Sequence, residues 1–111
     1  MNKPIIINVS INDTSWKVRF LPSDQMREGD NGTCWSLKRT IDIDDSLGYH
    51  EAKMVLTHEL MHALMATQGR SFEAELNNES VCEIVAWNLD KIVRLRDSIM
   101  QQRYKKESDA K

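Results

Sequence analysis

The sequence lacks long hydrophobic runs, a large net charge and a pattern of paired cysteines. Hydrophobic residues make up 41% of the 111 residues, but polar residues interrupt them throughout, so neither a transmembrane helix nor a signal-peptide core is expected. The formal net charge of −2 gives no indication of a nucleic acid or an anionic membrane as partner. Cys34 and Cys82 form no CxxC pair and are expected to be small buried apolar side chains. We therefore expect a soluble, cytoplasmic protein.

The first 44 residues carry the alternating pattern of β-strands. Hydrophobic and polar residues alternate over 5–11 and again over 16–20, and "NDTS" at 12–15 between them is typical of a turn. This predicts an antiparallel hairpin. The segments "TCWSL" (33–37) and "RTIDID" (39–44) are two further strand candidates.

From about Gly48 the hydrophobic period becomes helical and continues to Gly69, which is expected to end the helix. A second helix is expected from residues 77–78 to about Tyr104, with residues 105–111 as a disordered charged tail. The expected core positions of the two helices are Ala52, Leu56, Leu60, Ala63, Val81, Val85, Ile92, Leu95 and Ile99. The sequence thus predicts one α+β domain over residues 1–111, in which a small antiparallel or mixed sheet precedes two helices.

The first predicted helix contains the sequence "HELMH" at 58–62 within an otherwise apolar segment. A helix turns by about 100° per residue, so His58 and His62 lie on one face and their imidazoles can converge on one point. Glu59 lies beside them, where it can reach a water molecule at that point. This is the His-Glu-x-x-His arrangement, with two zinc ligands and a general base on one rigid element.

A simpler interpretation makes His58 and His62 hydrogen-bonded core residues and pairs Glu59 with a basic group elsewhere. Burying two imidazoles and a carboxylate without partners is costly, and a bound divalent cation removes that cost. We therefore favour a Zn²⁺ site.

A catalytic zinc site commonly has three protein ligands and one water, so a third ligand is needed. His50 lies more than two turns before His58 and is expected at the surface. A carboxylate from the second helix is the best candidate, namely Glu79, with Glu83 accepting a hydrogen bond from a ligand histidine. Glu83 itself, Glu75 and Glu73 are the alternative ligands.

Taken together, "HELMH" and the later "NESVCE" at 78–83 resemble the gluzincin metallopeptidases. The similarity covers about residues 39–95, and it is closest to the minimal prophage proteins near the ImmA/IrrE-like peptidases. The resemblance implies a zincin-like core in a bacterium or phage-infected host, with Glu79 as third ligand and Glu83 as outer carboxylate.

Two departures from zinc-peptidase patterns limit this resemblance. Met65 and Gln68 replace the glycine and the last histidine of the metzincin motif, so that clan is not indicated. No residue matches the His or Tyr with which larger gluzincins stabilise the tetrahedral intermediate. The nearest substitutes, which match no family motif, are Tyr49, His50, Arg103 and Tyr104.

The expected function is hydrolysis of a peptide bond by a metal-activated water, with Glu59 as general base. An extended peptide or protein substrate would add to an exposed strand edge near Thr40–Asp44, where Asp42 and Asp44 would favour basic or neutral peptides. The alternative is a phage-related binding or assembly module that keeps zinc for stability and cleaves little. A metal-free interaction domain is the third interpretation.

Overall fold

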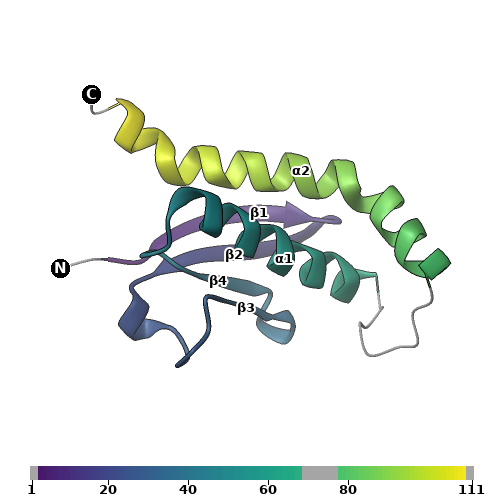
Figure 1. Ribbon diagram of the computed structural model, residues 1–111, viewed down its shortest axis with the longest axis horizontal. Helices are drawn as coiled ribbons and strands as arrows, with labels where there is room; N and C mark the ends of the chain where they lie inside the picture. Colours follow the sequence, from purple (N-terminus) through teal and green to yellow (C-terminus); the bar gives the residue numbers. More distant parts are fainter. Residues whose placement is uncertain (1–2, 69–77, 110–111) are drawn as a thin grey trace.

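A computed structural model describes residues 3–68 and 78–109, with side chains over 3–68 and 82–104. It has four strands followed by two helices, which confirms the predicted α+β layout (Figure 1). The elements in chain order are β1 (Ile5–Ile11), β2 (Thr14–Leu21), the 3-10 turn η1 (Ser23–Gln25), β3 (Gly32–Trp35), the 3-10 turn η2 (Ser36–Lys38), β4 (Thr40–Asp44), α1 (Tyr49–Thr67) and α2 (Asn78–Asp109).

The predicted hairpin is confirmed as β1 and β2, which pair antiparallel along their whole length. Its turn places Asn12 and Asp13 at φ values of 49° and 63°, the left-handed region that Asn and Asp tolerate better than most residues. The Asn12 side chain donates to Thr67 Oγ1 at 2.9 Å and accepts from Lys91 Nζ at 3.1 Å. The turn is thereby tied to both helices.

The four strands form one mixed sheet in the order β1-β2-β4-β3, in which β4 runs parallel to β2 and antiparallel to β3. The prediction of an exposed edge near Thr40–Asp44 is therefore wrong, because β4 is hydrogen-bonded to a neighbour on each side. The edge strand on this side of the sheet is β3, which contacts α1.

Ile and Asp alternate in β4, and the polar side of the strand is covered at Asp42. Asp42 is only 5% exposed, since Arg19 and Trp35 on the flanking strands both donate hydrogen bonds to it.

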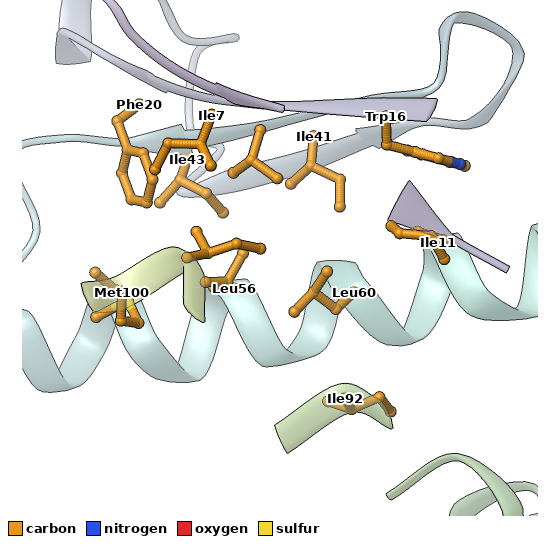
Figure 2. Close-up of a cluster of buried hydrophobic side chains, with 14 of the residues drawn as sticks. Ile7, Ile11, Trp16, Phe20, Ile41, Ile43, Leu56, Leu60, Ile92 and Met100 are labelled. Carbon is orange, nitrogen blue, oxygen red and sulfur yellow. The ribbon is translucent and has the colours of Figure 1, made fainter. Parts of the chain in front are cut away.

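The hydrophobic core lies between the sheet and the two helices, which cover one face of it (Figure 2). Ile41 and Ile43 of β4 project from the sheet towards Leu56 and Leu60 of α1, while α2 contributes Ile92 and Met100. The four core positions predicted for α1 are all confirmed as buried: Ala52, Leu56, Leu60 and Ala63. Because this face of α1 packs against the sheet, the backbone of α1 is held rigidly and supports the side chains on the other faces of the helix.

In α2 the predicted apolar stripe is confirmed only in part. Ile92 and Ile99 are buried and Leu95 packs against the core. Val85 is exposed, whereas the adjacent Ile84 is buried, so the buried face at this end of α2 does not follow the predicted stripe. The side chain of Val81 lies outside the described residues.

The C-terminal end of α2 also differs from the expectation. The helix continues past Tyr104 to Asp109, through most of the stretch predicted to be a disordered tail, and residues 110–111 lie outside the described part. Neither α1 nor the described length of α2 is long and apolar enough to cross a membrane. The cysteines are both free. The prediction that both are buried is wrong for Cys82, which is exposed, and Cys34 is only half-buried against the core.

Candidate metal centre

His58 and His62 lie one turn apart on α1, and their Nε2 atoms are 3.2 Å from each other. Two imidazole nitrogens bound to one tetrahedral zinc ion at about 2.0–2.1 Å would be about 3.3–3.4 Å apart. The pair therefore has the separation that two ligands of one zinc ion require. The same distance also fits a hydrogen bond between two neutral imidazoles.

The two histidines differ in how much of them water reaches. The His58 side chain is 68% exposed, whereas His62 is half-buried. Burial, and after it the neighbouring His58, lowers the pKa of His62. Both effects favour the neutral imidazole, which is the form that binds a metal.

Glu59 is the only charged residue of α1 that is buried, at 7% exposed. Its Oε2 lies 4.0 Å from His58 Nε2, and among the described side chains no hydrogen-bond donor reaches it. Burial raises its pKa, with Asp30 adding to the rise and His58 opposing it. A buried carboxylate without a donor, beside two converging imidazole nitrogens, is a set of groups that a cation and its water would satisfy.

The buried position of Glu59 depends on the close approach of β3 to α1 at Gly32. A Cβ atom on Gly32 would lie 2.5 Å from Val55 Cγ1 and 3.2 Å from Glu59 Cγ. Only a glycine leaves room for the helix there. In the sequence, Gly32 belongs to a polar, glycine-containing stretch that is typical of a loop. No local signal distinguishes a loop glycine from one that packs closely against a helix, so the sequence did not predict its packing role.

A cavity of about 340 Å³ opens beside Glu59, between α1 and the turn that leads into β3. One wall comes from α1 and the other from the turn and the start of β3. The lining residues are Gly29, Asp30, Asn31, Gly32, Met54, Val55, His58 and Glu59. The cavity is large enough for one substrate side chain. It gives solvent and ligands access to the Glu59 carboxylate.

The predicted third ligand cannot be placed, because the Glu79 side chain lies outside the described residues. Glu73 and Glu75 lie outside them as well. Glu83 is described, and it is exposed; it lines a different cavity, next to Gln68 and Trp87. Trp87 is itself 81% exposed, so Glu83 lies on a part of α2 that faces solvent. Among the side chains that the structure describes, no cluster of three or more His, Cys, Asp or Glu could hold a metal ion.

The sequence offered four substitutes for an oxyanion-stabilising residue, and all lie away from this cavity. Tyr49 packs edge-on against both His50 and Tyr104, and Arg103 donates to Asp45 at 2.7 Å. These contacts join α2 to the start of α1. None of the four residues lines the cavity beside Glu59.

Comparison with models of known protein families, with curated proteins and with solved structures found no match for this chain. The resemblance to gluzincins thus stands on the residues of the motif alone.

Proposed function

We propose that the protein is a zinc-dependent peptidase in which Glu59 is the general base. The observation that carries the proposal is the buried Glu59 carboxylate, which has no donor among the described side chains and lies beside the converging His58 and His62 nitrogens. A carboxylate in that position is costly for the fold and useful for moving a proton.

His58 and His62 would hold the zinc ion, with Glu79 as third ligand by the resemblance to gluzincins. When bound, zinc would polarise the scissile carbonyl and lower the pKa of a water molecule.

Glu59 provides the acid–base chemistry of the chain itself. Its carboxylate accepts a proton from the attacking water as the C–O bond forms, and it passes that proton to the leaving nitrogen as the C–N bond breaks. Burial helps this role, because a raised pKa brings Glu59 closer to the neutral pH at which it must both accept and release a proton.

The edge strand β3 supports binding of an extended peptide. One side of β3 pairs with β4, and no described strand pairs with its other side. A peptide could add there main chain to main chain and pass the cavity beside Glu59. We therefore propose that the substrate pairs with β3, and not with β4 as the sequence pattern predicted.

The test is Glu59→Gln in untagged, zinc-loaded protein, assayed by mass spectrometry for cleavage of a random decapeptide library. We expect at least about 100-fold slower cleavage, with zinc content and melting temperature retained, because the amide fills the same space but accepts no proton. The matched control is Glu51→Gln, an exposed glutamate on the same helix, which should cleave like the wild type. Equal cleavage by the Glu59→Gln protein would refute Glu59 as the general base, and no cleavage by the wild type would refute the peptidase.

A zinc-stabilised binding or assembly module is the second candidate. It is favoured by the described part of the cavity lining, which includes no Tyr, Arg or further His to stabilise a tetrahedral oxyanion. The same experiment separates the two, since a module would bind zinc and cleave nothing even as the wild type.

A further inference from the structure

The cavity beside Glu59 has an apolar wall on α1. Met54 is 67% exposed, which is high for so large an apolar side chain, and Val55 continues the same wall inward. An exposed methionine at a cavity mouth is suited to contact with a flexible aliphatic chain.

The opposite wall carries the acidic side chain of Asp30. Its Oδ2 accepts a hydrogen bond from Thr33 Oγ1 at 3.2 Å, which orients the carboxylate. Arg27 Nε lies 3.6 Å from the same oxygen, but Arg27 is 68% exposed and outside the cavity lining. An ion pair of that length and exposure is weak and easily exchanged for another cation.

The described residues that line the cavity carry formal charge of one sign. Asp30 and Glu59 are both acidic, and no lysine or arginine is among the described lining residues. A positive group that enters the cavity meets the Asp30 carboxylate on the wall that lies across from α1, so its binding there is electrostatically favoured.

From this arrangement we propose that the cavity binds a lysine or arginine side chain of the peptide substrate, and that Asp30 recognises its cationic end. The proposal rests on the proposed peptidase function and names the substrate class of that same site. The aliphatic stem lies against Met54 and Val55, and the ammonium or guanidinium group reaches Asp30.

The apolar wall decides between two sources of positive charge. A free peptide α-amino group would satisfy Asp30 but would leave Met54 and Val55 without a contact. A long basic side chain satisfies both walls. Asp42 and Asp44 were expected to favour basic or neutral peptides, but Asp42 does not support this expectation, because Arg19 already neutralises it.

The test compares zinc-loaded wild type and Asp30→Asn on decapeptides that differ at one position, occupied by Arg, Lys, norleucine or Glu. The position is chosen from the library cleavage sites, and each peptide is made with a free and with an acetylated amino terminus. We expect the wild type to cleave Arg and Lys peptides about five- to tenfold more efficiently than the norleucine peptide, judged by kcat/KM. In Asp30→Asn the Arg and Lys values should fall to the norleucine value measured with the same variant, so the ratio between peptides, and not the basal rate, is the readout.

Two further variants control for damage to the fold. Asp30→Glu keeps the charge and should keep the preference, and Asp24→Asn removes an exposed carboxylate of η1 outside the cavity and should behave as wild type. If zinc-loaded wild type cleaves no peptide, the proposed function fails and this inference fails with it. If peptides are cleaved without a preference for Arg and Lys, or the preference survives in Asp30→Asn, this inference alone is overturned. Loss of cleavage on acetylation would replace it with recognition of the α-amino group.

Discussion

Two carboxylates of this protein are almost equally buried, yet their surroundings are opposite. Asp42 on β4 is 5% exposed and Glu59 on α1 is 7% exposed. Asp42 accepts hydrogen bonds from Arg19 Nε at 2.7 Å and from Trp35 Nε1 at 2.9 Å, and the second Arg19 nitrogen makes the pair bidentate at 2.8 Å. Glu59 receives no such bond from any described side chain, and its nearest charged neighbour of the same sign, Asp30, raises its pKa further.

This difference separates a structural role from a functional one. The Asp42 site is complete within the fold, since three donors from neighbouring strands satisfy its charge. The Glu59 carboxylate has no donor from the described side chains, and it faces a cavity that solvent and ligands can enter. A buried polar group without a protein donor is costly, and proteins keep such groups at binding and catalytic sites.

The largest effect that we expect follows from removing the satisfied carboxylate. Asp42→Ala leaves the Trp35 indole and the Arg19 guanidinium without their acceptor. We expect a loss of about 3 kcal/mol in the free energy of unfolding, at the lower end of the range for a broken buried pair because Arg19 is partly exposed. Glu59→Gln should cost little or should stabilise the metal-free protein. Urea denaturation of both variants measures this, and similar losses for the two would remove the distinction between the sites.

A smaller loss is expected from disturbing the contact that buries Glu59. In Gly32→Ala the added methyl group meets Val55 and Glu59, so β3 and α1 must separate or Glu59 must move. Overpacking of this kind costs about 1–3 kcal/mol, and zinc affinity should fall with it.

The matched control for this substitution is Gly48→Ser, at the N-terminus of α1. No atom lies within 4 Å of a Cβ placed there, and serine is a favoured residue at a helix N-terminus. Its stability and zinc affinity should equal or exceed those of the wild type. If Gly32→Ala behaves like Gly48→Ser, the close approach of β3 has no role in placing Glu59.

The smallest effect concerns pH and the metal-free protein. The folded protein raises the pKa of Glu59, so its contribution to stability is fully present below the ordinary carboxyl pKa of about 4.3 and is lost as pH rises through the raised value. Glu59→Gln stays neutral throughout. Its melting temperature in EDTA should therefore match that of the wild type near pH 4 and exceed it by a few degrees at pH 7. A difference that does not change with pH would show that Glu59 is not held in an unfavourable environment.

The sequence predicted the hairpin, the two helices and the helical face of His58 and His62, because each depends on a local period or turn. It did not predict the partners of Asp42 or the edge position of β3. Both depend on which strands pair, and the alternation of residues within one strand does not show which strands lie beside it. It also missed Gly32 and Asp30, since a tight contact and a cavity wall arise only when a turn and a helix distant in sequence meet. The proposed zinc ligand Glu79 remains a prediction.

The central claim is that His58, His62 and Glu59 form the site of a bound zinc ion. Its most direct test is equilibrium titration of untagged, metal-free protein with Zn²⁺ against a competing chelator, beside His58→Ala and His62→Ala. We expect one zinc ion per wild-type chain and at least about 100-fold weaker binding in either variant, with Glu59→Gln still binding one equivalent. A wild-type protein that takes up no zinc, or histidine variants that bind it as tightly, would contradict the account.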